Sequence, residues 1–144
     1  MTQTKELQLS YWNDFKVYLK NTNSTLESGN AHSRYWHAIF IGINNAYFEL
    51  TISKGTNRVE LRLNGINAKE NFRLLKKYEL QAEKILGKLI WDEQPNNKLS
   101  KIYLIYAANL SDKNKWEEQF KWLKNNLEDM KKFFEPIIKR DLIP

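Results

Sequence analysis

Hydrophobic and polar positions recur with different periods along the chain, and each change of period predicts a different element. Near the start, Leu9, Trp12 and Leu19 recur close to helical spacing, which predicts a helix over Leu7–Asn21. The stretch 21–33 that follows is polar and rich in turn-forming residues, so we expect a mobile loop there.

Three segments after this loop predict strands, because β-branched and aromatic residues dominate them. Their expected bounds are Tyr35–Ile43, Tyr47–Ser53 and Arg58–Leu63. The connections between them are short, and a parallel return needs a crossover of about a dozen residues or more, so we expect an antiparallel meander. Alternation in the third strand places Arg58, Glu60 and Arg62 on one outward side, and this face of the sheet is expected to be exposed to water.

The second half of the chain predicts two helices and two further strands. The first helix is expected to begin at Asn67 as its N-cap, with Glu70 reaching back to it, and to end at Gly87. Its buried stripe is expected to consist of Phe72, Leu75, Tyr78, Ala82 and Ile85. A short strand at Leu89–Trp91 and a longer one at Lys101–Tyr106 follow it.

A long amphipathic helix is expected near the C-terminal end, capped by Ser111 or Asp112. Its apolar positions recur in alternating steps of four and three residues, and they are Trp116, Phe120, Leu123, Leu127, Met130, Phe134 and Ile137. Such a stripe suits a helix that lies across the sheet, and it also suits the seam of a homodimer. Pro136 is expected to kink or end the helix.

Together these elements predict an α+β fold in the order αβββαββα, with an antiparallel sheet of about five strands and the helices on one face. A length of 144 residues fits a single domain, 1–144. The chain has no cysteine, which excludes disulfides, thiolate nucleophiles and cysteine-based metal sites. Neither a signal peptide nor a membrane-spanning apolar run is visible, so we expect a cytoplasmic protein without a membrane partner.

The sequence lacks the residue patterns of a self-sufficient enzyme. It contains no Gly-x-Ser-x-Gly, P-loop or His-Glu-x-x-His motif, and neither His32 nor His37 has a second ligand at a recognisable spacing. A dinucleotide fold would need glycines that open a helix after a strand, and the chain has five glycines in all. We therefore expect no catalytic residue, no cofactor and no bound metal.

One acidic arrangement could still carry metal-dependent chemistry. Alternation puts Glu49 and Glu60 on the same side of neighbouring strands, with Arg62 beside them. A nuclease site needs two acids and a cation near a magnesium ion, but an arginine cannot give up its proton and replaces a lysine poorly there. Cross-strand ion pairs explain the same residues, and we favour that interpretation.

The net charge of +6 is unevenly distributed. Residues 31–91 carry ten Lys and Arg against five Asp and Glu, whereas residues 1–30 are neutral. This excess permits contact with nucleic acid, although an ordinary mixed-charge surface explains it as well. The candidate residues for binding nucleic acid or a small ligand are Arg34, Trp36, Arg58, Glu60, Arg62, Arg73, Lys76 and Lys77, with Tyr47 and Tyr103 as further stacking aromatics.

Several short motifs occur in an order that resembles a known family. They are Tyr11-Trp12 with Phe15, Trp36 with Phe40-Ile41-Gly42, Arg58-Val59-Glu60-Leu61-Arg62-Leu63, Phe72 with Leu74-Leu75, Glu83 with Gly87, Leu89 and Trp91, Ser100-Lys101-Ile102, and Trp116 with Trp122-Leu123. Over about residues 7–139 the chain resembles the bacterial and archaeal domain-of-unknown-function family numbered 4268. That family has no established activity, and its pattern centres on Trp36, Arg58, Glu60, Glu83, Trp91 and Trp116.

The resemblance implies a role near restriction or DNA processing, because family members often follow a part that resembles a PD-(D/E)XK nuclease. A chain without that part is expected to bind and not to cut. The resemblance also implies that Arg58, Glu60 and Glu83 could form a buried or grooved polar network.

Three functions therefore stay open. The first is a non-catalytic, nucleic-acid-associated binding module whose partner is DNA or a nuclease-type protein. The second is a protein-interaction domain, with a homodimer formed through the C-terminal helix. The third is a small-ligand pocket at the junction of sheet and helices, lined by Trp36, Arg58 and Glu60.

Overall fold

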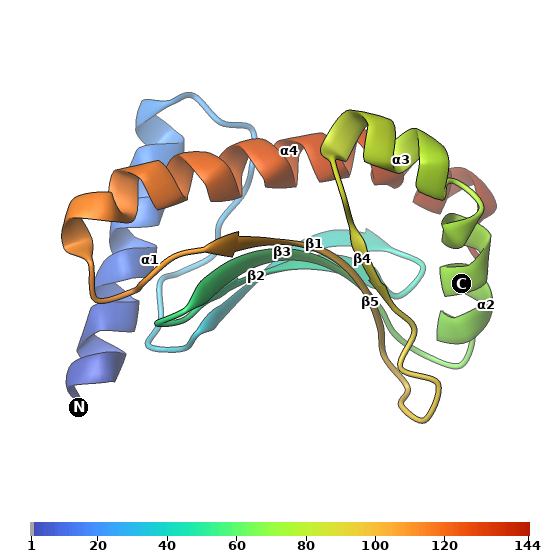
Figure 1. Ribbon diagram of the computed structural model, residues 1–144, viewed down its shortest axis with the longest axis horizontal. Coiled ribbons are helices and arrows are strands. Elements are labelled where there is room, and N and C mark those ends of the chain that lie inside the picture. Colours follow the sequence, from blue (N-terminus) through green and yellow to red (C-terminus); the bar gives the residue numbers. More distant parts are fainter. Residues whose placement is uncertain (1) are drawn as a thin grey trace.

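A five-stranded antiparallel sheet carries the helices on one of its faces in the computed structural model, which describes residues 2–144 and the side chains of all of these except 40–43 (Figure 1). Along the chain the elements are α1 (Gln3–Asn21), β1 (Trp36–Ile43), β2 (Ala46–Ile52), β3 (Thr56–Leu63), α2 (Ala68–Lys76), α3 (Glu79–Leu86), β4 (Ile90–Asp92), β5 (Ser100–Ala107) and α4 (Trp116–Asp141). The α+β class and the antiparallel sheet that the sequence predicts are confirmed.

The strands lie side by side in the order β1-β2-β3-β5-β4, and every neighbouring pair is antiparallel. The first three form the expected meander, with Asn44 and Asn45 at positive φ in its first turn. β5 then adds to β3, so the short β4 forms the far edge. The sheet bends away from the helices, which makes its helix-free face concave (Figure 1).

The hydrophobic core fills the space between the sheet and α4. From the strands it takes Phe48, Leu50, Val59, Leu61, Ile102 and Leu104. Every residue of the stripe predicted for the last helix is buried against this face, and none is more than 7% exposed. The stripe therefore covers the chain's own sheet, and a homodimer seam at these positions has no exposed surface to use.

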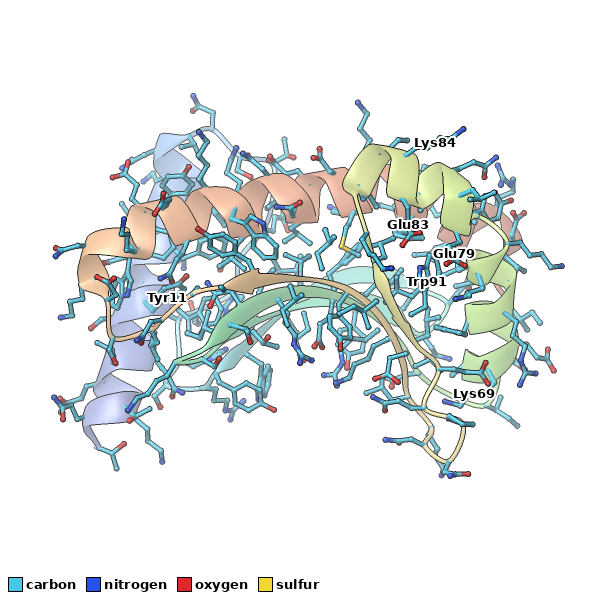
Figure 2. All side chains as sticks on the ribbon, viewed as in Figure 1. Tyr11, Lys69, Glu79, Glu83, Lys84 and Trp91 are labelled. Atoms are coloured by element: carbon cyan, nitrogen blue, oxygen red, sulfur yellow. The ribbon has the colours of Figure 1, made fainter. Side chains whose placement is uncertain are left out.

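A small polar network inside the core ties α1 to β3 and α4. The side-chain amide of Asn57 donates to the Tyr11 hydroxyl at 3.1 Å and to Gln119 Oε1 at 3.3 Å. The Tyr11 hydroxyl in turn donates to Gln119 Oε1 at 3.0 Å. Burial raises the pKa of Tyr11, which Figure 2 labels, so this hydroxyl stays protonated and keeps its role as a donor.

The single helix predicted up to Gly87 is wrong, because the chain forms α2 and α3 with a break at Lys77 and Tyr78. α2 packs on β3 and β5, whereas α3 packs on α4, and one straight helix could not reach both around the curved sheet. The break also turns Leu86 toward the core and leaves the predicted core residue Ile85 66% exposed. Gly87 ends α3 as predicted, at a φ of +81°.

The predicted cap of α4 is wrong as well, and Pro136 does not end the helix. The helix begins at Trp116 after a 3₁₀ turn, so neither Ser111 nor Asp112 caps it. Pro136 lies inside the helix, which continues to Asp141. A proline removes one backbone donor, and the buried stripe on both sides of it keeps the helix against the sheet.

The start of α1 differs from the prediction, whereas α2 begins directly after Asn67 as predicted. α1 begins at Gln3, because the hydroxyl of Thr2 accepts a hydrogen bond from the Lys5 N–H at 3.2 Å and caps the helix. Asn67 occupies the N-cap position of α2, but its side chain makes no capping hydrogen bond, and its amide donates instead to the carbonyl of Pro144 at 3.0 Å. No helix among residues 2–144 is long and apolar enough to cross a membrane.

Candidate functional site

The helix-free face of the sheet brings five charged side chains together. Glu49 of β2 lies directly opposite Glu60 of β3. Arg58 and Arg62 flank Glu60 along β3 on the same face, because side chains two residues apart in a strand share a side. Lys101 of β5 lies opposite Arg62. We call these five residues the charged cluster.

Ion pairs centred on Glu60 hold the cluster together. Arg58 Nη1 lies 3.5 Å from Glu60 Oε2, while Arg62 Nε and Lys101 Nζ lie 3.6 Å and 3.9 Å from Glu60 Oε1. Arg62 Nη1 donates a hydrogen bond to Glu49 Oε2. Three cations face two carboxylates, so the cluster carries a net charge of +1 when all five groups are ionised.

Both carboxylates are buried although they point away from the helices. Glu60 is 1% exposed and Glu49 is 6% exposed. The expectation of a water-exposed face is therefore wrong at this position. The concave bend of the sheet brings the long side chains of neighbouring strands toward one another, and these cover the acids. The predicted cross-strand ion pairs are confirmed.

Burial changes the acidity of one carboxyl group in the cluster, that of Glu49. It raises the pKa of the Glu49 carboxyl above its ordinary value of 4.5, while the positive charge of Arg62 opposes the rise and the neighbouring Glu60 adds to it. Two carboxylates directly opposite each other on adjacent strands repel, and the neighbouring cations offset this repulsion. The guanidinium of Arg58 also lies 4.5 Å from the centre of the Tyr103 ring, as a cation–π contact.

One carboxylate oxygen of the cluster has no hydrogen bond. Glu60 Oε1 is buried and its neighbouring cations lie beyond hydrogen-bonding distance, and the Nε of Arg62 is likewise without an acceptor. Buried polar atoms almost always have a partner, so these two atoms call for an explanation. A cavity of about 340 Å³ opens beside them, and it is lined by the charged cluster together with Tyr35, Thr51, Ile52, Ser53 and Thr56.

The structure divides the predicted binding residues into two groups. The sheet-face group contains Arg58, Glu60 and Arg62 of the cluster, and Trp36 near them. Trp36 pairs with Thr51 on β2, which in turn pairs with Arg58 on β3. The guanidinium of Arg34 lies 5.1 Å from the centre of the Trp36 ring, which places both at the rim of the same face.

The second group lies in the helix layer, around α2. Arg73, Lys76 and Lys77 are all exposed. Arg73 Nη2 lies 3.1 Å from the carboxylate of Glu93, and Lys76 Nζ lies 3.3 Å from that of Glu79. Arg73 and Lys76 thus form exposed ion pairs in the helix layer.

Glu83 lies outside the cluster, so the polar network implied by the family resemblance is wrong for this residue. Its carboxylate accepts a hydrogen bond from the backbone N–H of Leu89 at 2.8 Å. Figure 2 shows Glu83 on α3 above Trp91 of β4. Glu83 therefore fixes the connection between α3 and β4.

Sequence reasoning did not identify Lys101 as a site residue. Alternation along β5 would have put Lys101 and Tyr103 on one side, but their use depends on β5 pairing with β3. The small-ligand pocket expected at the junction of sheet and helices is wrong in its position. The cavity beside Arg58 and Glu60 opens on the opposite, helix-free face.

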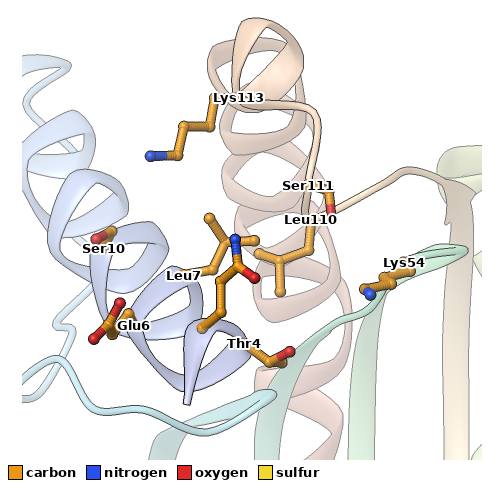
Figure 3. A pocket seen from close by; sticks show the side chains of 9 residues that line it. Thr4, Glu6, Leu7, Ser10, Lys54, Leu110, Ser111 and Lys113 are labelled. Atoms are coloured by element: carbon orange, nitrogen blue, oxygen red, sulfur yellow. The ribbon is translucent and has the colours of Figure 1, made fainter. Parts of the chain in front are cut away.

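Another hollow, of about 490 Å³, lies between the start of α1 and the segment before α4 (Figure 3). It is lined by Gln3, Thr4, Glu6, Leu7, Ser10, Lys54, Leu110, Ser111 and Lys113. All of these are exposed except Leu7 and Leu110. Its ionisable groups are therefore solvated, and nothing in this hollow matches the buried charges of the cluster.

The two histidines meet beside α1. The rings of His32 and His37 stack with their centres 5.1 Å apart, and Trp12 lies 5.1 Å from His37 on another side. Ser28 Oγ lies 2.8 Å from His37 Nε2. His37 is only 3% exposed, and this burial lowers its pKa to about 4. Within the described part of the chain no group of three or more His, Cys, Asp or Glu could hold a metal ion.

Comparison with known proteins adds a family and no activity. No curated protein matches the chain. The sequence model of the family described as "Domain of unknown function (DUF4268)" matches residues 7–138. This range contains all five strands and the whole charged cluster. The resemblance seen in the sequence motifs is thereby confirmed, and the chain belongs to the DUF4268 family.

Proposed function

We propose that this domain is a non-catalytic binding module that takes single-stranded nucleic acid across the helix-free face of its sheet. The observation that carries the proposal is the charged cluster. It places Arg58, Arg62 and Lys101 on the floor of a concave face that α1 to α4 leave uncovered. Cations at such spacing can contact successive phosphates, and an open antiparallel sheet is a common platform for single strands.

The aromatic residues of this face support the same function. Tyr103 and Tyr47 lie on the helix-free side of β5 and β2, each with a guanidinium of the cluster near its ring. Trp36 lies on the same side of β1. Bases stack on such rings with about 1–3 kcal/mol each, independently of sequence.

The two acids support binding without cleavage. A catalytic magnesium ion needs carboxylates whose negative charge is not already neutralised by neighbouring cations. Glu49 is hydrogen-bonded to Arg62, and Glu60 has three cations within 4 Å of its oxygens. A divalent ion placed between the acids would be repelled by the side chains that already neutralise them.

Fluorescence anisotropy with single-stranded and duplex oligonucleotides at about 50 mM salt tests this proposal, because phosphate contacts are strongest at low salt. The informative variant is Lys101→Ala, since Lys101 lies 3.9 Å from Glu60 and makes the longest ion pair of the cluster. We expect weaker binding and a salt slope smaller by about 0.7, the value for one phosphate contact on a single strand.

The matched control is the double variant Lys76→Ala with Lys77→Ala, which removes two cations near the end of α2. We expect it to bind like the parent. If it weakens binding while Lys101→Ala does not, the ligand lies on α2 and the proposed face is wrong. If no oligonucleotide binds at low salt, the proposal as a whole is wrong.

The homodimer alternative has less support, because the stripe that motivates it is covered by the sheet. The nucleic-acid module fits a place in the cytoplasm near restriction or DNA-processing enzymes, with a nuclease-type protein as the partner that would cut. This context rests on the family resemblance.

A further inference from the structure

We infer that the charged cluster binds guanine selectively, because the carboxylate of Glu60 accepts hydrogen bonds from the N1–H and N2–H of this base. The inference rests on the proposed function and names the base that the same face selects from a single strand.

The missing hydrogen bond of Glu60 defines what the ligand must offer. Glu60 Oε1 is a buried atom without a hydrogen-bond partner, in a side chain that is only 2% exposed and belongs to a residue that lines the cavity. A carboxylate only accepts, so the ligand must present N–H or O–H groups. Its two oxygens lie side by side and accept two parallel N–H groups best.

Among the common bases, guanine alone presents two neighbouring donors on its pairing edge. Adenine and cytosine place one amino group next to a ring nitrogen that is an acceptor, and this acceptor would face the second carboxylate oxygen. Thymine and uracil have a single N–H between two carbonyls. A buried carboxylate therefore repels part of the pairing edge of every base except guanine.

The cations beside Glu60 can bind the remaining group on the pairing edge of guanine, which is the O6 carbonyl oxygen. The Nε of Arg62 is buried and without an acceptor, 3.6 Å from Glu60 Oε1. It can donate to the O6 of guanine, which lies next to N1–H, and arginine is a frequent partner of this oxygen. Lys101 Nζ lies 3.9 Å from the same carboxylate oxygen and can serve O6 or a phosphate.

The cavity suits a single base. Its volume of about 340 Å³ is near the lower end of the range of small-molecule sites, which is about 300–1,000 Å³. The planar guanidinium of Arg58 lines the cavity, and its carbon lies 4.5 Å from the centre of the Tyr103 ring, which holds it in place. The polar lining from Thr51 and Thr56 is compatible with a ribose or deoxyribose at the opening.

The test uses thymine oligonucleotides of about 12 nucleotides with one central guanine, adenine, cytosine or hypoxanthine, measured by anisotropy with the unaltered domain. A good bidentate contact is worth about 1–3 kcal/mol, so we expect the guanine oligonucleotide to bind about tenfold tighter than the adenine and cytosine ones. Hypoxanthine lacks the N2 amino group and keeps N1–H and O6. Most of the guanine preference should therefore disappear with it.

The variant Glu60→Gln tests the residue that is assigned to the contact. It keeps the shape of the side chain and removes the charge that faces Glu49, and Arg62 keeps its hydrogen bond to Glu49, so we expect a smaller loss of stability than for removal of Arg62. The guanine preference should fall to less than twofold, while the affinity for the all-thymine strand stays or rises. The matched control is Glu79→Gln, which removes a half-exposed carboxylate on α3 and should leave the preference intact.

The outcomes separate the two proposals. If all single strands bind equally, the guanine inference is wrong and the proposed function stands. If adenine or cytosine is preferred, or if hypoxanthine binds as well as guanine, the assigned contact is wrong. If no strand binds, both are wrong. The base comparison uses the unaltered protein, so it decides the question even if Glu60→Gln does not fold.

Discussion

Replacing Arg62 by alanine is expected to destabilise the domain strongly, although Arg62 faces away from the hydrophobic core. Its guanidinium donates to Glu49 and lies 3.6 Å from Glu60, and both carboxylates are buried. The Arg62 side chain is itself only 17% exposed, so solvent screens the interaction weakly. Removing one partner of a buried ion pair costs about 3–5 kcal/mol, and we expect a loss of unfolding free energy in that range at neutral pH.

The pH dependence of this loss follows from the acids that remain. Burial already raises the pKa of Glu49 above 4.5, and Arg62 is the strongest influence that opposes the rise. Without Arg62 the pKa rises further. Between 4.5 and this raised pKa the folded state holds a proton that the unfolded state has lost, so stability falls as the pH increases through this window. The difference in unfolding free energy between the variant and the parent should therefore become smaller as the pH is lowered.

Urea unfolding at pH 7 and at about pH 5 measures both effects. The matched control is Arg73→Ala, because Arg73 is 66% exposed and pairs with Glu93; its removal should cost about 1 kcal/mol or less. Adding Glu49→Gln to Arg62→Ala should recover part of the loss, since one of the uncompensated charges is then gone. A cost of less than about 1 kcal/mol for Arg62→Ala, or a gap that does not narrow at low pH, would refute this account.

Two further predictions concern the packing around the sheet. Burial lowers the pKa of His37 to about 4, so its ring should titrate near that value in NMR spectra. The stability that the neutral ring contributes should be lost as the pH falls from 6.5 toward 4. A titration midpoint at or above 6.5 would contradict the burial of His37. Leu127→Ala should lower the free energy of unfolding by about 2–5 kcal/mol in urea, because Leu127 is fully buried on α4. The unaltered protein should sediment as a monomer at micromolar concentration. A stable dimer would contradict the assignment of the whole stripe to the sheet.

Alternation predicted the strands well because it depends on local geometry. In β3, Val59 and Leu61 face the core, while Arg58 and Arg62 face the other side. The observed bounds of β1, β2 and β3 differ from the predicted ones by one or two residues. Successive side chains of a strand must point to opposite faces, so apolar periodicity reports the core side directly.

The burial of Glu60 could not be predicted in the same way. Alternation gives the side of the sheet that a residue faces, and it says nothing about what covers it. Glu60 is buried because Glu49 lies on one neighbouring strand, Lys101 on the other, and the sheet curves around them. The pairing of β3 with β5 joins segments separated by two helices, and this long-range pairing has no local signal in the sequence.

The break between α2 and α3 has a similar origin. Neither Lys77 nor Tyr78 is a helix breaker by composition, and the apolar spacing continues across them. The interruption follows from the curved sheet and the two different surfaces beneath the helices, which are β3 with β5 for α2 and α4 for α3. Tertiary packing overrides the local helix preference here. The apolar spacing of the sequence therefore predicts Ile85 in the core, whereas the break leaves it exposed.

The charged cluster departs from the rules that make a stable fold. A structural role alone would be served by a hydrogen-bonded pair such as Arg62 with Glu49, or by apolar residues of similar size, which are often equally stable or more stable. Glu60 instead has three cations nearby and an oxygen without a hydrogen bond, beside a cavity. Departures of this kind are expected at binding sites, because a ligand can supply the missing partner. The exposed cations of α2 show no such departure, and this difference is why the concave face, and not α2, is the better candidate for the site.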